Sequence, residues 1–241
     1  QFDHRNTQLH DLDDGLLKDY DDSLKNFQKE HNLTIFHLMG QHVNYKQRYR
    51  TKQARFWASS YEDKRPELTN AQRKMLSHYD NATLYNDSIV AQIVKRFQKQ
   101  DAIVIYVPDH GEECYEENRG FICRNHSAEI DWPLAHYEFE IPFWIYCSPK
   151  YIRNHRDIYR QIRKAKDKRF MTDALPHLLL YLAGIETATY KEEYNILSPK
   201  YDEMRPRILK NSADYDKLRD AHLEKIKKEE SKKVKKKERR N

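Results

Sequence analysis

The chain has 241 residues, with 44 Lys or Arg against 38 Asp or Glu, so its formal net charge is +6. Residues 225–241 hold eight Lys and two Arg against three Glu, a net +7, which leaves −1 for residues 1–224. A body without basic excess argues against a nucleic-acid-binding surface spread over the fold. The 34% of charged residues and the lack of a long apolar run argue against an integral membrane protein.

Hydrophobic spacing predicts two helices and a strand in the first hundred residues. Apolar residues recur at helical spacing over residues 16–27, and we expect Asp13 and Asp14 to cap the start of that helix. Residues 33–39 are apolar and rich in strand-forming types, which predicts a buried strand. A spacing of three to four residues over 71–100 predicts a long helix.

The second half predicts two more buried strands, over residues 101–107 and 141–147, joined by a long polar stretch. Apolar residues from Thr172 to Gly184 predict a further helix, with the glycine at its end. Strands separated by helices are typical of an α/β fold with a mostly parallel central sheet flanked by helices. Such folds place their chemistry at the carboxyl ends of their strands.

The sequence Asp109-His110-Gly111-Glu112 directly follows the second predicted strand. Neighbouring side chains can share one metal ion only where the chain turns sharply, and Pro108 and Gly111 favour such a turn. A carboxylate with an imidazole suits Zn²⁺ or another borderline divalent ion better than Ca²⁺. The alternative is a polar turn in which Asp109 caps the next segment and His110 is merely exposed.

Three further histidines are candidates for contacts with an anion. His37 lies within the first predicted strand, where a hydrogen-bonded core histidine is the more common interpretation. His42 follows at the carboxyl edge of that strand and is placed to donate to a phosphate or sulfate oxygen. His126 lies in the polar stretch near Arg119 and Arg124, and taken alone it is a solvated loop histidine.

The ordered motifs resemble the catalytic domain of the lipopolysaccharide phosphoethanolamine transferases, members of the sulfatase and alkaline-phosphatase superfamily. The resemblance covers most of residues 9–218, and the ordered set is more specific than Asp-His-Gly-Glu alone. The matching segments are His37-x-x-Gly-x-His42, Tyr79-Asp-Asn-Ala82, Asp109-His-Gly-Glu112, His126, Ile141-Pro-Phe-Trp144, 169–184 and 194–199.

The resemblance implies a transferase with a zinc site, for which Mn²⁺ or Ca²⁺ are alternatives. It makes Asp109 and His110 metal ligands, and it makes His42 and His126 the histidines that contact the transferred phosphoryl group. In that family a zinc-activated threonine attacks phosphatidylethanolamine, and the phosphoethanolamine group then passes to lipid A, a core sugar or another cell-envelope glycan. The resemblance also implies a parent protein anchored in the inner membrane with a periplasmic catalytic domain.

The family's threonine nucleophile, a further acidic ligand and the membrane-spanning segment lie N-terminal to the region matched here. We therefore expect residues 1–224 to be the C-terminal part of a sulfatase-like domain, incomplete on its N-terminal side, and inactive alone. Two other hypotheses remain. One is a sulfatase-type hydrolase of sulfuric esters, and the other is a non-catalytic remnant or surface-binding module with the same fold.

Residues 225–241 have almost no apolar side chains and cannot join a core. One interpretation is a basic, solvated tail that keeps the protein soluble. The other is a contact with a membrane surface that carries anionic lipid.

Overall fold

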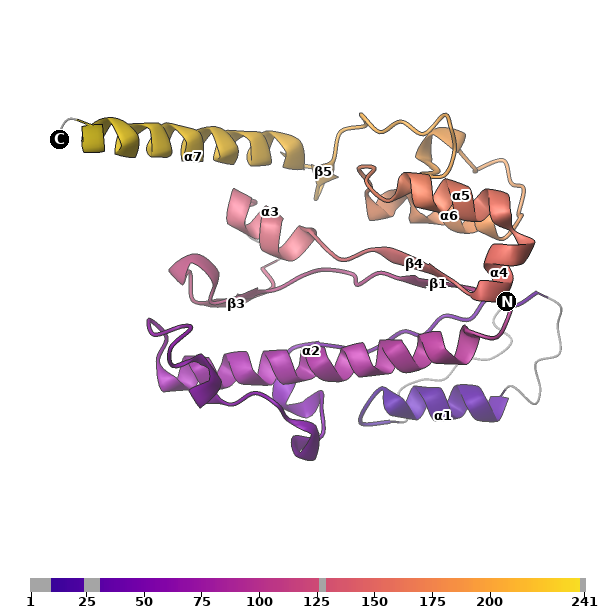
Figure 1. The fold of residues 1–241 in the computed structure, drawn as a ribbon, viewed down its shortest axis with the longest axis horizontal. Coiled ribbons are helices and arrows are strands. Elements are labelled where there is room, and N and C mark those ends of the chain that lie inside the picture. Colours follow the sequence, from indigo (N-terminus) through magenta and orange to yellow (C-terminus); the bar gives the residue numbers. More distant parts are fainter. Residues whose placement is uncertain (1–9, 24–30, 126–128, 239–241) are drawn as a thin grey trace. The chain divides into compact units, whose positions relative to one another are not determined.

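The computed structural model describes residues 10–23, 31–125 and 129–238 (Figure 1). It divides the chain into two compact units, Gln1–Gln98 and Lys99–Asn241. The predicted boundary at residue 225 lies inside one continuous helix of the second unit. No helix among the described residues is both long enough and apolar enough to cross a membrane.

The first unit is built on α2 (Asn70–Phe97), which confirms the long predicted helix. Thr69 caps its start in a capping box with Gln72, which satisfies amides that the helix itself leaves unpaired. Asn81, on the buried face of α2, accepts from the backbone amides of Arg55 and Phe56 and thus holds the preceding segment on the helix. The other helices of this unit are α1 (Asp14–Ser23) and the 3-10 turns η2 (Tyr45–Gln47), η3 (Thr51–Gln53) and η4 (Ala58–Tyr61).

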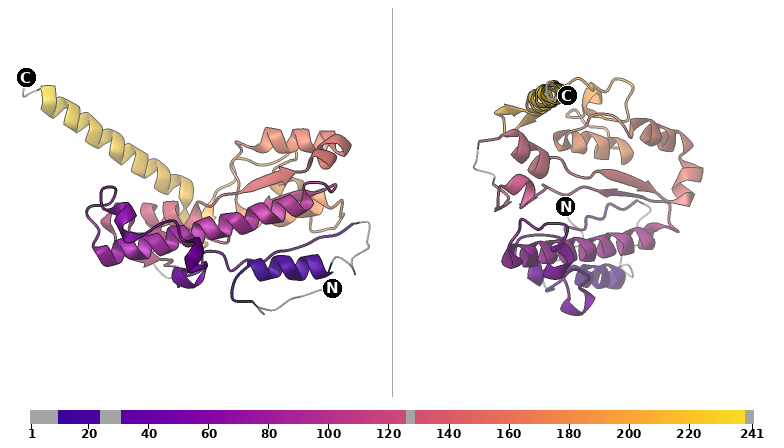
Figure 2. Two further views of the ribbon diagram at one scale, coloured as in Figure 1. Left: turned by 60° about the horizontal axis from the view of Figure 1, so that its bottom comes forward. Right: turned by 60° about the vertical axis from the view of Figure 1, so that its left-hand side comes forward.

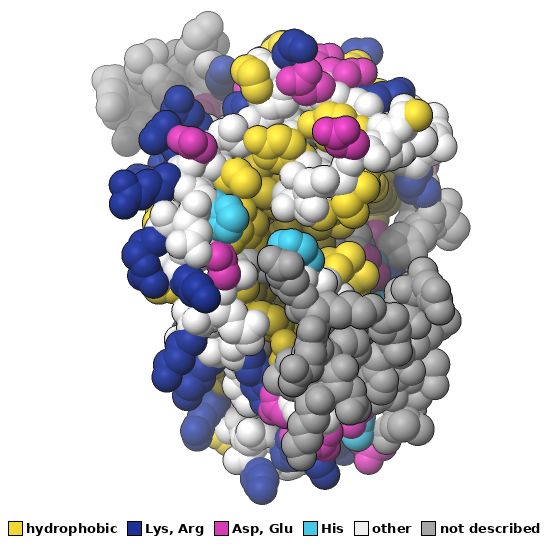
Figure 3. All heavy atoms as spheres, turned by 90° about the vertical axis from the view of Figure 1, so that its right-hand side faces the viewer, with side chains coloured by type: hydrophobic (Ala, Val, Ile, Leu, Met, Phe, Trp, Pro, Cys, Tyr) yellow, Lys and Arg dark blue, Asp and Glu magenta, His cyan; other side chains and the backbone are white. Residues whose placement is uncertain are grey.

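The predicted strand over residues 33–39 does not form, because no strand among the described residues of this unit is there to pair with it. Leu33 and Ile35 are 78% and 71% exposed, so the run is not buried either. Phe36 packs toward the helices, with its ring 5.2 Å from that of Tyr20 and 6.3 Å from that of Phe97. On the face drawn in Figure 3, exposed apolar side chains lie among charged ones.

The second unit contains three short pairs of strands. β1 (Ile103–Tyr106) pairs with β4 (Trp144–Cys147), β2 (Glu113–Cys114) with β3 (Phe121–Cys123), and β5 (Ile208–Leu209) with β6 (Ala213–Asp214). The strands predicted at 101–107 and 141–147 are therefore confirmed as β1 and β4, but they are only partly buried, with Cys147 the one buried residue of the two.

All three described pairs are antiparallel, and a mostly parallel sheet is not found among the described residues. The reason lies in the connection, because the chain enters β4 at the end where it leaves β1. Tyr106, the last residue of β1, lies opposite Trp144, the first residue of β4.

The described part of the second unit also contains five helices (Figures 1 and 2). They are α3 (Trp132–Phe139), α4 (Pro149–Asn154), α5 (Arg156–Ala165), α6 (Leu175–Leu182) and α7 (Tyr215–Glu238), with 3-10 turns η5 (Glu116–Asn118), η6 (Thr172–Ala174) and η7 (Glu192–Tyr194). The predicted helix over 172–184 is found as η6 followed by α6, and Gly184 ends it with a positive φ of 65°.

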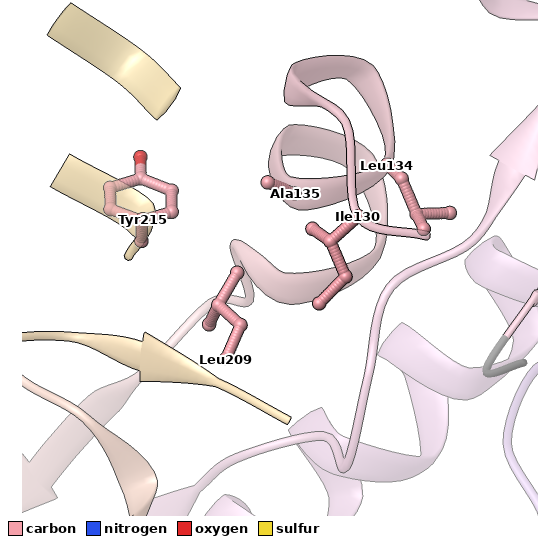
Figure 4. Close-up of a cluster of buried hydrophobic side chains, with 5 residues drawn as sticks. All are labelled: Ile130, Leu134, Ala135, Leu209 and Tyr215. Carbon is pink, nitrogen blue, oxygen red and sulfur yellow. The ribbon is translucent and has the colours of Figure 1, made fainter. Parts of the chain in front are cut away.

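Two clusters of buried apolar side chains hold the second unit together. One joins α3 to the start of α7 and consists of Ile130, Leu134, Ala135, Leu209 and Tyr215 (Figure 4). The other joins α5 and α6 to the segment before residue 200 and is centred on Leu178, which is fully buried. Burying such side chains contributes about 1.5–3 kcal/mol each.

Candidate metal site

The Asp109–Gly111 turn follows β1 and fixes the tautomer of His110. The Nδ1 atom of His110 lies 2.7 Å from the carbonyl oxygen of Gly111. Because a carbonyl can only accept, Nδ1 carries the proton and Nε2 keeps its lone pair. A backbone carbonyl that holds the second ring nitrogen is the usual support of a metal-binding histidine.

The lone pair of His110 Nε2 points toward two charged groups. The guanidinium of Arg124 donates to it at 3.0 Å, and a carboxylate oxygen of Asp109 lies 3.7 Å away. Two ligands at about 2.0–2.2 Å from a tetrahedral ion are about 3.4 Å apart. The 3.7 Å between His110 Nε2 and the Asp109 carboxylate is close to that separation.

The end of α3 holds this turn in place. The amide of Gly111 donates to the carbonyl oxygen of Glu138 at 2.8 Å. A Cβ atom at Gly111 would lie 2.1 Å from the carbonyl oxygen of Tyr137, so only glycine fits there. The Glu138 carboxylate also accepts from the amide of Asn125 at 2.7 Å, which ties the segment carrying Arg124 to the same helix end.

Glu138 is a buried acid beside this turn, with 1% of its surface exposed. Burial raises the pKa of its carboxyl, and the nearby carboxylates of Glu112 and Glu113 act in the same direction. Its Oε2 atom has no hydrogen-bond partner among the described residues. The carboxyl therefore holds a proton more readily than an exposed glutamate does.

Arg119 stabilises the start of α3 rather than standing free for an anion. It donates to the fully buried carboxylate of Glu113 at 2.8 Å and to Asp131 at 2.7 Å. Asp131 is the N-cap of α3 and accepts from the amide of Leu134. Partial burial alone would raise the pKa of Asp131, but the Leu134 amide and Arg119 outweigh it and lower that pKa.

His42 belongs to the first unit, and its side chain is exposed. Its amide closes a turn by donating to the carbonyl oxygen of Met39 at 3.1 Å. The buried carboxylate of Asp13 accepts from the amides of Met39 and Gly40, at 2.9 and 2.8 Å. The Asp13 carboxylate therefore holds the turn before His42, while the Asp13 carbonyl oxygen accepts from the amide of Leu16 at the start of α1.

The predicted site residues have different outcomes. Asp109 and His110 lie together, whereas His42 lies in the other unit and His126 lies outside the described residues. His37 is exposed, so the core-histidine interpretation is wrong. Within the described ranges, no group of three or more His, Cys, Asp or Glu side chains is arranged to hold a metal ion.

Sequence reasoning missed the supporting residues. Glu138 and Asp131 do not belong to any recognisable sequence motif. The one signal in the sequence is that acidic residues lie at both ends of a short helix within a polar stretch. The role of Asp13 was hidden because its partners are 26 and 27 residues further along the chain.

The family model described as Sulfatase matches residues 3–185, which is most of the chain. The chain therefore belongs to the sulfatase family. It is 31% identical over 202 residues to phosphoethanolamine transferase EptC of Escherichia coli O18:K1:H7, covering 83% of this chain and 33% of that protein. It is 32% identical over 160 residues to the Kdo(2)-lipid A phosphoethanolamine 7''-transferase of Escherichia coli K12, covering 65% and 27%.

The fold is also similar to that of a solved relative. The crystal structure of the C-terminal periplasmic domain of Escherichia coli EptC in complex with Zn superposes with a TM-score of 0.70 and 28% sequence identity. The superposition covers 89% of this chain and 60% of that domain. The chain spans about a third of the length of the full transferases it resembles.

Proposed function

We propose that this chain is part of a metal-dependent transferase that moves phosphoethanolamine from phosphatidylethanolamine to lipid A or to a core or glycan acceptor of the cell envelope. The observation that carries the proposal is the Asp109–His110 pair, with its ring tautomer fixed for a metal ion, in a chain of this family. The relatives named for lipid A indicate the acceptor class.

Asp109 and His110 fit a zinc ion, in the donor types they supply and in their separation. Zinc held there would favour the ionised form of a hydroxyl nucleophile and offset the negative charge of the phosphoryl oxygens. The chain's own part is to hold that ion: the Gly111 carbonyl keeps the proton on Nδ1, and α3 keeps the turn rigid. Arg124 would have to release His110 Nε2 for binding.

His42 and His126 take the roles that the resemblance gives them, as donors to the phosphoryl oxygens and as the acid for the leaving group. Support for His42 is its exposed ring on a turn that a buried carboxylate fixes. A fixed donor is preorganised for a developing negative charge.

We propose that the isolated polypeptide does not turn over, because the residues matched here supply two ligands and no nucleophile. A purified, zinc-loaded sample should release no phosphoethanolamine from a labelled phosphatidylethanolamine donor. Release by this chain alone contradicts that part of the proposal.

The transferase function is tested in a chimera in which residues 1–224 replace the matching part of Escherichia coli EptC. We expect the chimera to add phosphoethanolamine to lipopolysaccharide in cells, measured by mass spectrometry. His110→Ala should abolish the addition at equal expression, whereas His31→Ala, which changes another exposed histidine, should not. A His110→Ala chimera that still modifies lipopolysaccharide would refute the role of this turn.

Zinc binding is a second, separate prediction for the isolated chain. Asp109→Ala and His110→Ala should each weaken zinc binding on the order of tenfold or more, measured by calorimetry, because each removes one of two ligands. The matched His31→Ala variant should bind as the unaltered chain does. Equal affinities in all four proteins would show that the ion binds elsewhere.

A further inference from the structure

One side of α5 (Arg156–Ala165) packs into the core of the second unit. Ile158, Ile162 and Ala165 follow each other at helical spacing and pack into the cluster around Leu178. The Tyr181 hydroxyl of α6 also donates to Gln161 at 2.8 Å. The orientation of α5 about its own axis is therefore fixed by packing.

The opposite side of α5 carries a basic stripe, made of Arg156, Arg160, Arg163 and Lys164. These residues are spaced i, i+4, i+7 and i+8, so they lie in one row, and all four are exposed. Asp157 is the helix's single acid and pairs with Arg160 at 3.2 Å, with the Asp157 side chain 86% and the Arg160 side chain 66% exposed. Among the described residues, the other three cations of the stripe make no ion pair.

The preceding helix extends the basic surface. Lys150 and Arg153 of α4 are exposed as well. Residues 150–169 hold nine Lys or Arg and two Asp, a net +7. Since residues 225–241 also carry +7, subtracting both from the total of +6 leaves −8 for the rest of the chain. The body that is near neutral in sum therefore has an uneven distribution of charge, with a local basic excess at α4 and α5.

The stability of α5 does not explain the stripe. Like charges four residues apart, as in Arg156 with Arg160 and Arg160 with Lys164, destabilise a helix. Arg156 lies in the first turn, where a cation opposes the helix dipole. Only Arg163 and Lys164, in the last turn, interact favourably with that dipole. An external anion is the remaining source of stabilising contacts for this row.

We propose that the basic stripe of α5 binds the phosphate groups of an anionic phospholipid bilayer. Guanidinium groups bind phosphate oxygens through paired hydrogen bonds, and three of the four cations are arginines. Because the apolar side of α5 is packed in the core, the helix contacts the bilayer surface without inserting into it. This inference does not depend on the transferase function.

The charge distribution favours a bilayer over a nucleic acid. A planar lipid surface touches one face of the protein, and acidic residues elsewhere stay outside the Debye length of about 8 Å. A nucleic acid is held by a positive surface that follows its backbone over a large contact area. The stripe lies on one helix of ten residues, which is a small positive surface for such a contact.

The C-terminal part of α7 is also basic, with eight Lys against three Glu over residues 225–238, a net +5, but its charges are arranged differently. From residue 223 to residue 233 every side chain of α7 is exposed, and this part extends away from the other helices of the unit (Figure 2). Its lysines interleave with glutamates, as in the pair Glu224 and Lys228. No side chain from 223 to 233 is buried, and Glu229 and Glu230 separate Lys228 from Lys232, which makes this part of α7 the matched control for α5.

The test is sedimentation of the full chain with phosphatidylcholine vesicles that do or do not contain phosphatidylglycerol. We compare Arg156→Gln/Arg160→Gln/Arg163→Gln with Lys225→Gln/Lys228→Gln/Lys232→Gln, since each removes three cations. At about 1 kcal/mol per cation near an anionic surface, the α5 variant should lose on the order of a hundredfold in affinity for the anionic vesicles. The α7 variant should lose much less.

A variant that keeps the positive charges shows whether any loss of binding comes from unfolding rather than from the loss of charge. Arg156→Lys/Arg160→Lys/Arg163→Lys should retain most of the binding and should melt as the unaltered chain does. Equal losses in the α5 and α7 glutamine variants, or a loss confined to the α7 variant, would overturn the proposal. So would an α5 variant that loses binding to a single-stranded oligonucleotide while it still sediments with anionic vesicles.

Discussion

The turn before His42 and the turn that carries His110 are each held by an acidic residue far away in the sequence, but by different atoms. In the first unit the side chain of Asp13 accepts two backbone amides. In the second unit it is the backbone carbonyl of Glu138 that accepts, from Gly111. The first restraint therefore depends on a side chain, and the second depends on how closely two backbone segments approach.

This difference decides which substitution can break each turn. The first turn is vulnerable at its acid, whereas the second is vulnerable at its glycine. Gly40 and Gly111 also serve different purposes. Gly40 has a positive φ of 54° with ordinary space around it, while Gly111 is required because a side chain would strike the carbonyl of Tyr137.

We expect Gly111→Ala to have the largest effect. Its Cβ atom would lie 2.1 Å from a backbone oxygen, so the turn or the end of α3 must move. Overpacking of this kind costs about 1–3 kcal/mol or more, and it displaces His110. The free energy of unfolding in urea and the zinc affinity should both fall.

Gly40→Ala is the comparison for this variant. Alanine would have to adopt the left-handed backbone conformation of Gly40, which lowers the free energy of unfolding by about 1–2 kcal/mol. The zinc affinity should not change. If Gly40→Ala lowers zinc affinity as much as Gly111→Ala does, the contrast between the two turns is wrong.

The sequence predicted the parts of this architecture that depend on local pattern. The long helix, the two strands and the sharp turn after β1 follow from periodicity and from Pro108 and Gly111. The supports of the turns could not be predicted, since Asp13 and Glu138 act on residues 26 or more positions away. Periodicity carries no information about contacts of that separation.

The failure at residues 33–39 has a related cause. Leu33 is apolar, and Thr34 and Ile35 are β-branched as in many strands, but a strand is stabilised by its neighbours. No described strand of the first unit pairs with the run. The basic stripe of α5 was missed for the opposite reason, because summing charge over residues 1–224 concealed a local basic excess at α4 and α5.

Asp13→Ala should have the next largest effect and should act on the first turn. The substitution leaves the amides of Met39 and Gly40 without their acceptor in a part-buried place. An unpaired buried group costs about 1–3 kcal/mol, and these two amides are only part-buried, so the total cost should lie near the lower end of that range. Hydrogen exchange of these two amides should accelerate, whereas the Gly111 amide should exchange as before.

Asp13→Asn is the milder variant, because its one remaining side-chain oxygen can still accept. Exchange at Met39 and Gly40 should then fall between that of the unaltered chain and that of Asp13→Ala. Unchanged exchange in Asp13→Ala would show that the turn does not depend on this carboxylate.

Asp131→Asn should have the smallest effect and tests how far the second turn depends on the start of α3. Asparagine is as good an N-cap as aspartate, so the main loss is the half-exposed ion pair with Arg119, worth less than about 1 kcal/mol.

The folded-state pKa of Asp131 is lowered, so the stability it contributes is present above its ordinary pKa of 3.8 and is lost as the pH falls through the folded pKa. The difference in unfolding free energy between the unaltered chain and Asp131→Asn should therefore be largest near neutral pH and vanish in acid. A difference that instead grows as the pH falls below 3.8 would show that the Arg119 pair does not stabilise the folded state.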